Sequence, residues 1–347
     1  MSQLGAVVIG RNEGTKLRRC LASVVGKAAP VVYVDSGSLD GSVGLARAAR
    51  VEVVELDPAI PFTVARARNE GFVRLVQVDP SVELVQFIDA DSEMVDTWFA
   101  LALQAFAADS RCAAVCGRLI ERSSGRSIYG RLYSIMNDAR LADPAVSNGI
   151  AMMRVAPFRE MDGFVPWLVG SEDREISLRL GRAGWRVRRI DADMAVHEAG
   201  METFGQWWRR RMMNGRSSGQ QMALGAPDRR IVREWLSICF WGLALPVLAL
   251  ASAAKTGGAS LLLFLGYAKL ALRIHGRMRR LGFAPPEARL YAAACTVEKF
   301  PKALGLVRYY LESILRRLGV HRKARDSRSP EGARLVAVSR LDPDRRS

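Results

Sequence analysis

Short apolar runs that end in polar loops alternate with amphipathic segments over the first 90 residues. The apolar runs, which we interpret as buried strands, lie at residues 5–10, 31–35, 51–56 and 84–89. Between the first two, Leu17, Leu21 and Val24 recur at helical spacing. This alternation predicts an α/β fold with a mostly parallel sheet flanked by helices. In such sheets the ligand binds beyond the carboxyl ends of the strands.

Two apolar stretches dominate the C-terminal part of the chain. The first, residues 236–254, is 19 residues long and uncharged, enough for a helix to cross a hydrocarbon core of about 30 Å. The second, residues 257–272, is shorter and contains Lys269, so it spans, re-enters or lies at the interface. Arginines flank both outer ends, which predicts a hairpin with both ends in the cytoplasm. A buried helical hairpin of a soluble protein is the alternative.

These patterns predict three parts. Residues 1–225 form the α/β domain, and residues 226–321 form a helical, membrane-associated region. Within that region, apolar residues at helical spacing predict an amphipathic helix at 302–318, either on the membrane surface or packed against other helices. Residues 322–347 are polar and rich in arginine, which predicts a disordered basic tail.

Charge separates the two ends of the chain. With 347 residues, 49% of them hydrophobic and 25% charged, the composition excludes a disordered or fibrous protein. The net charge of +16 lies in the C-terminal part, because residues 1–200 hold 24 basic and 25 acidic side chains and residues 201–347 hold 27 and 10. Such an excess suits a polyanion, and the apolar stretches favour an anionic membrane over nucleic acid. Five irregularly spaced cysteines argue against a disulfide framework.

The clearest candidate for chemistry follows the fourth apolar run. Asp89 and Asp91 are spaced so that both side chains can turn toward one ligand once the chain has left the strand. Paired carboxylates suit Mg²⁺ or Mn²⁺, which proteins often hold together with substrate phosphates. A solvated acidic turn is the other interpretation of this pair.

A second acidic pair begins a predicted helix. Glu172 and Asp173 precede apolar residues at helical spacing, and the helix dipole alone would favour acidic residues there. The functional interpretation is a general base, since a carboxylate fixed at a helix start can take a proton from an attacking hydroxyl.

Two further features carry candidate contacts. His197 follows an apolar, strand-like run and is either a metal ligand or a surface histidine. Trp207, Trp208 and Arg209 belong to an aromatic and basic segment that stacks on a sugar or binds phosphate, or anchors the chain at a membrane interface.

Several motifs occur together in one order along the chain. They are VVIGRNEG, VDSGSLDGS, ARNEG, FIDADSE, EMDGF and SEDREISLRLGRAGW. In this combination, over roughly residues 5–215, the sequence resembles family 2 glycosyltransferases, which are nucleotide-sugar enzymes with a GT-A fold. The C-terminal part looks like that of bacterial membrane-associated members that build cell-surface polysaccharide or glycolipid.

The resemblance implies roles for the first loops. Arg11, Asn12 and Glu13, with Asp35, would hold the base and ribose of the nucleotide. The residues of the ARNEG motif that would lie near the nucleotide are Arg68 and Asn69.

It also implies the reacting groups. Asp91 would coordinate Mg²⁺ or Mn²⁺, Asp89 would contact ribose or metal, and His197 would be a further metal ligand. Asp173 matches the catalytic base, and Glu172 would orient the acceptor or the base.

The function implied is inverting transfer of a sugar from a nucleoside-diphosphate sugar to a hydroxyl of a lipid-linked or glycan acceptor, at the cytoplasmic face of the membrane. The QxxRW signature of processive synthases is incomplete at residues 206–210, which favours transfer of a single sugar. The alternative is a catalytically silent, membrane-bound partner of a polysaccharide assembly complex.

Overall fold

The structure, a computed structural model, forms two compact units. The described residues are 3–122, 127–138, 140–141, 146–147, 149–198, 200–225 and 227–318. Apart from undescribed residues, the first unit comprises 1–122 and 141–199, and the second comprises 123–140 and 200–322. The predicted disordered tail, 322–347, lies outside the described residues.

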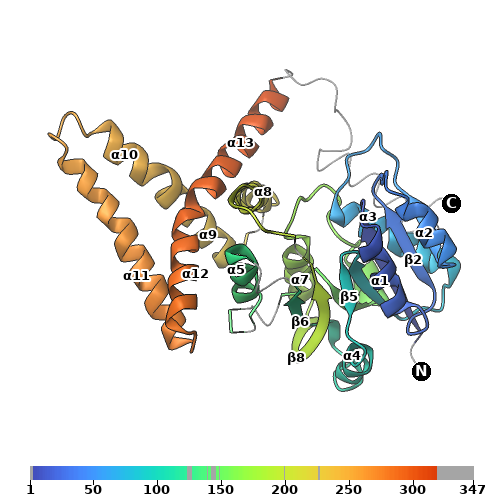
Figure 1. The fold of residues 1–347 in the computed structure, drawn as a ribbon. Coiled ribbons are helices and arrows are strands. Elements are labelled where there is room, and N and C mark those ends of the chain that lie inside the picture. The colour runs from blue at the N-terminus through green and yellow to red at the C-terminus, as the bar shows by residue number, and fades with distance from the viewer. Residues whose placement is uncertain are drawn as a thin grey trace. The chain divides into compact units, whose positions relative to one another are not determined.

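An eight-stranded sheet forms the first unit (Figure 1). The strands are β1 (Leu4–Gly10), β2 (Val31–Asp35), β3 (Glu52–Glu55), β4 (Leu84–Asp89), β5 (Ser92–Met94), β6 (Cys112–Glu121), β7 (Ala151–Arg154) and β8 (Arg186–His197). Their order is β3-β2-β1-β4-β7-β6-β8-β5. The first four strands are parallel, as the apolar runs predict, whereas β7 is antiparallel to β4 and β6, and β5 is antiparallel to β8.

Strand register places the candidate residues at one edge of the parallel half. Gly10, the last residue of β1, pairs with Asp35 of β2, and its neighbour Ile9 pairs with Asp89 of β4. The loops after these three strands therefore begin side by side. This is the edge at which ligands bind in parallel sheets.

Six helices belong to the same unit: α1 (Thr15–Val24), α2 (Ser42–Ala48), α3 (Val64–Val78), α4 (Trp98–Ala107), α6 (Val155–Glu160) and α7 (Glu172–Arg182). The start of α7 at Glu172 confirms the sequence prediction. An aromatic cluster joins α3, β4 and α6, since the Phe158 ring lies 4.6 Å from that of Phe72 and 5.2 Å from those of Phe87 and Phe164. This cluster fixes α3 beside the strand that ends in Asp89.

The second unit is helical. It comprises α5 (Ile128–Met136), α8 (Phe204–Ala223), α9 (Arg229–Cys239), the π-helical turn η1 (Phe240–Ala244), α10 (Leu245–Ala251), the 3₁₀ segment η2 (Ala259–Phe264), α11 (Leu265–Arg280), α12 (Pro285–Val297) and α13 (Lys299–Arg317). The sequence placed α8 in the 1–225 domain, but its extensive packing on α13 puts it in this unit. The amphipathic helix expected at 302–318 is α13.

One helix in the part of the chain that the structure describes, Arg229–Ala251, is long and apolar enough to cross a membrane. It contains α9, η1 and α10. The most apolar 18 residues of this helix have a mean hydropathy of 1.7, and 22% of them are buried. The second apolar stretch forms η2 and the start of α11. These helices are not both long and apolar enough to cross a membrane by the same criterion.

A group of charges, three of them buried and one, Glu234, partly exposed, lies where α8, α9 and α13 meet. Lys302 Nζ donates to Glu298 Oε1 at 2.9 Å and to Glu234 Oε1 at 3.3 Å, and Arg211 Nη1 donates to Glu298 Oε2 at 3.3 Å. Burial opposes ionisation of Glu298, but Lys302 and Arg211 hold its pKa below the usual range. The ions thus compensate one another within the helical unit.

Candidate active site

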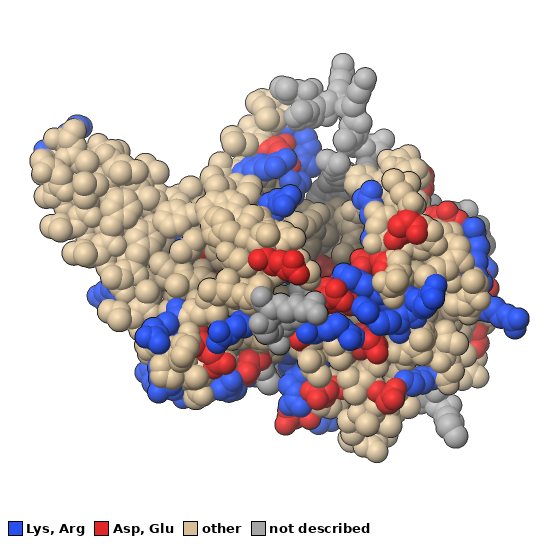
Figure 2. Space-filling view, in the orientation of Figure 1, with Lys and Arg blue, Asp and Glu red and all other residues tan. Residues whose placement is uncertain are grey.

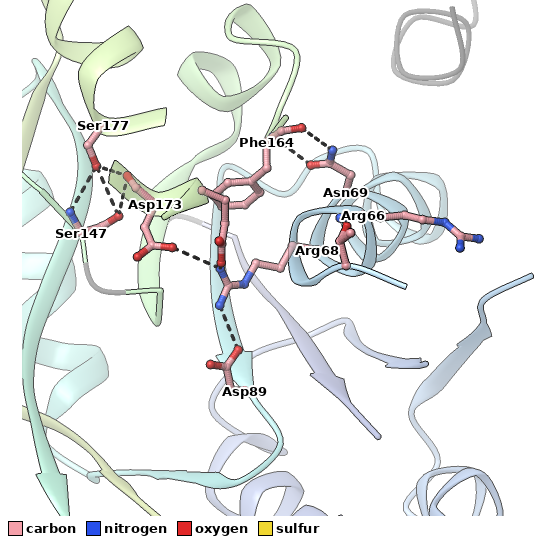
Figure 3. A network of polar contacts seen from close by, with 10 residues as sticks. Arg66, Arg68, Asn69, Asp89, Ser147, Phe164, Asp173 and Ser177 are labelled. Carbon is pink, nitrogen blue, oxygen red and sulfur yellow. Dashed lines mark hydrogen bonds and ion pairs between the residues drawn. The ribbon is translucent and has the colours of Figure 1, made fainter. Parts of the chain in front are cut away.

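A buried arginine joins the two acidic motifs (Figure 3). Arg68, on α3, is 1% exposed. Its Nη2 donates to Asp89 Oδ1 at 2.9 Å, and its Nη1 donates to Glu172 Oε1 at 2.9 Å and lies 3.7 Å from Asp173 Oδ1. Asp89 and the Glu172–Asp173 pair, which the sequence separates by about 80 residues, therefore lie on either side of one guanidinium.

The surroundings of Asp173 favour the protonated form of its carboxyl group. Burial and the neighbouring Glu172 carboxylate raise its pKa well above the usual value, and Arg68 offsets only part of that rise. The side chain nevertheless remains 22% exposed, whereas that of Glu172 is 7% exposed. A carboxylate with a raised pKa and partial access to solvent has the properties of a general base.

Asn69 forms two hydrogen bonds with the backbone of Phe164. Its Nδ2 donates to the Phe164 carbonyl at 2.7 Å, and its Oδ1 accepts from the Phe164 backbone N–H at 3.0 Å. The Arg68 guanidinium in turn lies over the Phe164 ring, with its Cζ 5.6 Å from the ring centroid. The resemblance implies a nucleotide contact for Asn69, but in this structure its amide holds the EMDGF loop in place.

Gly163 permits that arrangement. Its φ of +67° is unfavourable for other residues, and a Cβ there would lie 2.7 Å from Asn69 Oδ1. We expect Gly163→Ala to lower the free energy of unfolding by about 1–3 kcal/mol and to reduce activity, because Phe164 and Arg68 would shift. Chemical denaturation measures the first effect. Gly181→Ala is the matched control: a Cβ added at that position would meet no neighbouring part of the chain within 4 Å, and a helix interior favours alanine. Equal stability changes in both variants would contradict the assignment.

Asp91 and His197 lie together at the end of the other half of the sheet. His197 Nε2 is 3.2 Å from Asp91 Oδ2, and Ser92 Oγ donates to Asp91 Oδ1 at 3.2 Å. Burial opposes ionisation of Asp91, but the hydrogen bond and charge of His197 hold its pKa below the usual range. Asp91 is thus an ionised carboxylate beside an imidazole.

These two side chains fit a divalent ion. Among the residues that the structure describes, no three His, Cys, Asp or Glu side chains form a metal cluster. A carboxylate and an imidazole are acceptable ligands for Mn²⁺, and one or two protein ligands suffice when substrate phosphates supply others. Negative charge also gathers around Glu13. Burial and the charge of Asp91 raise the pKa of the Glu13 carboxyl group. Asp89, the third predicted ligand, accepts a hydrogen bond from Arg68 through Oδ1.

The first loops are tied to each other. The Asn12 backbone N–H donates to Ser38 Oγ at 2.8 Å, and Asn12 Oδ1 accepts from the Leu39 backbone N–H at 2.7 Å. Arg11 is exposed and its guanidinium lies 5.6 Å from the Phe62 ring centroid. These contacts leave the Arg11 guanidinium and the Asn12 amide nitrogen at the surface beside the strand ends.

Asp35 is buried at the end of β2 and is hydrogen-bonded to the loop that follows. It is 2% exposed. Its Oδ1 accepts from Tyr33 Oη at 2.9 Å, and its Oδ2 accepts from the backbone N–H groups of Gly37 and Ser38 at 2.9 and 2.7 Å. Asp35 therefore shapes the loop that follows β2.

The aromatic and basic segment lies on α8, in the second unit. Trp207 is 3% exposed, and the Phe204 ring lies 5.6 Å from it and 5.5 Å from Trp208. Arg209 is exposed, and its Nε donates to the Gly205 carbonyl at 3.3 Å. Trp207 is thus a packing residue, and Arg209 is the member of this set with an exposed charge.

The structure adds residues that sequence patterns did not indicate. Ser177 Oγ donates to the Asp173 carbonyl and accepts from the Ser147 backbone N–H at 3.2 Å, which anchors the first turn of α7. Glu121, at the end of β6, lies 3.5 Å from His197. No local motif marks these residues, because the contacts of Ser177 with Ser147 and of Glu121 with His197 join distant parts of the chain.

The fold of the first unit is that of a GT-A domain. The solved structures it resembles include a mannosyltransferase from Pyrobaculum calidifontis in complex with GDP-Man and Mn²⁺, at 19% identity and a TM-score of 0.58, covering 89% of this chain and 87% of that one. S. aureus TarS is a weaker match, at 15% identity and a TM-score of 0.46, covering 89% and 91%. No curated protein sequence matches significantly.

The family follows from the sequence match. Residues 6–161 match the family described as glycosyl transferase family 2. The first unit is therefore a family 2 glycosyltransferase domain, as the sequence motifs predict.

Proposed function

We propose that the protein is an inverting, metal-dependent glycosyltransferase that moves one sugar from a nucleoside-diphosphate sugar to a hydroxyl of a lipid-linked or other membrane-proximal acceptor. The observation that supports this most is the Arg68 network, which holds Asp89 and Asp173 on either side of one buried guanidinium. Donor-side and acceptor-side carboxylates are thereby fixed relative to each other.

The chemistry follows from these side chains. Asp173 accepts the proton of the acceptor hydroxyl, whose oxygen attacks the anomeric carbon as the bond to the nucleoside diphosphate breaks. Displacement from the face opposite the leaving group inverts the anomeric configuration. Glu172 and Arg68 keep the Asp173 carboxylate in position. A divalent ion held by Asp91 and His197 would neutralise charge on the departing diphosphate.

The donor would lie at the ends of β1, β2 and β4. Arg11, Asn12 and Glu13 are available there for the nucleoside, and we propose that Asp35 acts by shaping the neighbouring loop. Asp89 would contact the ribose or the ion while it keeps its bond to Arg68.

The second unit supports a membrane-proximal acceptor. The hairpin of α10, η2 and α11 carries exposed apolar side chains, among them Val247, Leu248, Leu250, Leu262, Leu265 and Leu272, each at least 60% exposed. Figure 2 shows little charge on this region. So large an apolar surface is unfavourable in water and suits the hydrocarbon of a bilayer. Basic residues precede and follow the hairpin, and on this basis we propose that its ends lie at the cytoplasmic face.

Sugar transfer by the purified, detergent-solubilised protein tests the proposal. Radiolabelled nucleotide sugars would be supplied with Mn²⁺ or Mg²⁺ and a membrane lipid extract, and the lipid fraction would be examined for label. We expect transfer from one class of donor, loss of transfer with EDTA, and recovery with Mn²⁺. Transfer that survives Asp91→Ala and Asp173→Asn would overturn the assignment of the site. Absence of transfer from every donor would favour the silent partner.

Membrane insertion has its own test. We expect the double variant Leu248→Asp and Leu250→Asp to move the protein from the membrane to the soluble fraction, because each carboxylate would cost about 2.5–3.5 kcal/mol in the bilayer centre. Both side chains are exposed, so the fold should persist. Leu39→Asp, at a 94% exposed leucine of the first unit, is the control and should stay membrane-bound. Release of the unmodified protein by high salt alone would argue against insertion.

A further inference from the structure

A carboxylate with no exposed side-chain surface lies behind the His197 imidazole. The Glu121 side chain is 0% exposed, and its Oε2 lies 3.5 Å from His197 Nδ1. On the opposite side of the ring, His197 Nε2 lies 3.2 Å from Asp91 Oδ2. The imidazole is thus set between a buried carboxylate and one that is partly exposed.

Strand pairing imposes this arrangement. Glu121, the last residue of β6, and Ser92, the first of β5, both pair with His197, the last residue of β8. The His197 carbonyl also accepts from the Arg122 backbone N–H at 2.9 Å, and the Asp91 carbonyl accepts from Glu198 at 3.3 Å. The backbone therefore holds all three side chains at one end of three neighbouring strands.

We propose that Glu121 is a positioning residue of the metal site, which rests on the proposed requirement for a divalent ion. A neutral imidazole has one N–H donor and one acceptor nitrogen, and an ionised carboxylate only accepts. With an ion bound at Nε2 and Asp91, the single N–H of the neutral imidazole would be on Nδ1, which faces Glu121. Removal of such supporting carboxylates typically weakens metal binding by 10- to 100-fold.

The burial of Glu121 supports this role over a purely structural one. A carboxylate removed from water is costly unless a specific partner compensates, and an amide or apolar side chain would fill the same space without that cost. A carboxylate 3.5 Å from Nδ1 is placed to accept its proton when Nε2 binds the ion, which would fix the ring and its tautomer.

The test is a titration of Mn²⁺ into the full-length protein, without and then with GDP or UDP, followed by the electron paramagnetic resonance signal of free Mn²⁺. We expect Glu121→Gln to raise the Kd for Mn²⁺ about tenfold. Glu93→Gln is the matched control: it removes the same charge two residues from Asp91, but Glu93 is 40% exposed and pairs with Arg19 and Arg122. Its Kd should stay within threefold of the unmodified value.

A double-variant cycle separates positioning from a general loss of structure. In a His197→Gln background, Glu121→Gln should change the Kd no further, because Glu121 acts through the imidazole. An equal loss with and without His197, or an unchanged Kd in Glu121→Gln, would overturn the inference while leaving the proposed metal dependence intact. Failure of the unmodified protein to bind Mn²⁺ under either condition would overturn both.

Discussion

Asp173→Asn is expected to lower kcat by about 10²- to 10⁴-fold, the usual contribution of a general base, and to make the protein more stable. Activity would be measured as sugar transfer at saturating donor, and stability as the thermal midpoint at pH 7. The raised pKa of Asp173 leads to both expectations.

The sign of the stability effect follows from proton linkage. A carboxyl whose pKa is higher in the folded than in the unfolded chain binds its proton more tightly when folded. The free energy of unfolding therefore falls as the pH rises from the unfolded toward the folded pKa. Asparagine removes this penalty, so Asp173→Asn should raise the midpoint at pH 7 and abolish that part of the pH dependence. In the unmodified enzyme, kcat/KM should fall as the pH decreases through a pKa above the ordinary aspartate value of 3.8.

Glu172→Gln provides the contrast within the same helical turn. Glu172 is 5% exposed and accepts a hydrogen bond from Arg68. The loss of charge in that bond should reduce the free energy of unfolding by about 1.5–3 kcal/mol. Opposite shifts of the midpoint are thus expected from two adjacent, nearly isosteric substitutions. A lower midpoint for Asp173→Asn would contradict the proposed balance of charges.

Arg68→Lys is expected to lower kcat by about 100-fold with little change in nucleotide affinity. A lysine ammonium is compact and cannot contact Asp89 and Glu172 together as the planar guanidinium does. Small displacements of reacting groups can cost this much in rate. The Kd for UDP or GDP, measured by calorimetry, should stay within threefold, since the guanidinium is buried among carboxylates.

Arg66→Lys, one half-turn earlier on α3, controls for the loss of a buried guanidinium. Arg66 donates to the carbonyls of Asp57 and Ile60, and its Nε lies 3.9 Å from Glu70 Oε1. Its substitution should reduce stability without the loss in kcat. If Arg68→Lys instead weakens nucleotide binding tenfold at constant kcat, the ligand role that the ARNEG motif implies would be the correct one.

The sequence predicts the parallel half of the sheet well because its signals are local. Each of the first four strands is a short apolar run ending in polar residues, and β1 to β4 appear at those positions. The start of α7 is equally local, since Glu172 and Asp173 directly precede the apolar residues of the helix. The family motifs then indicate which residues in the loops after these strands belong to the candidate site.

The roles of individual side chains depend on contacts that no local pattern encodes. Arg68 meets Glu172 across 104 positions of sequence, and only the packing of α3 beside α7 decides that its guanidinium is buried. The pairing of Glu121 with His197 likewise requires β6 and β8 to lie side by side. Burial likewise explains the loop contacts of Asp35, which its motif alone, implying a ligand contact, does not indicate.

The ionic group of Arg211, Glu234, Glu298 and Lys302 sets a limit on how deep the helical unit can enter a bilayer. Charges of this kind are expensive in hydrocarbon, and Glu234 precedes the uncharged segment of the same continuous helix by only two residues. A detergent micelle should therefore surround the hairpin and stop within α9. Within this helix, amide hydrogen exchange of the solubilised protein would then be uniformly slow from Phe240 to Ala251. It would be faster from Phe240 back toward Arg229, although both residues belong to one unbroken helix.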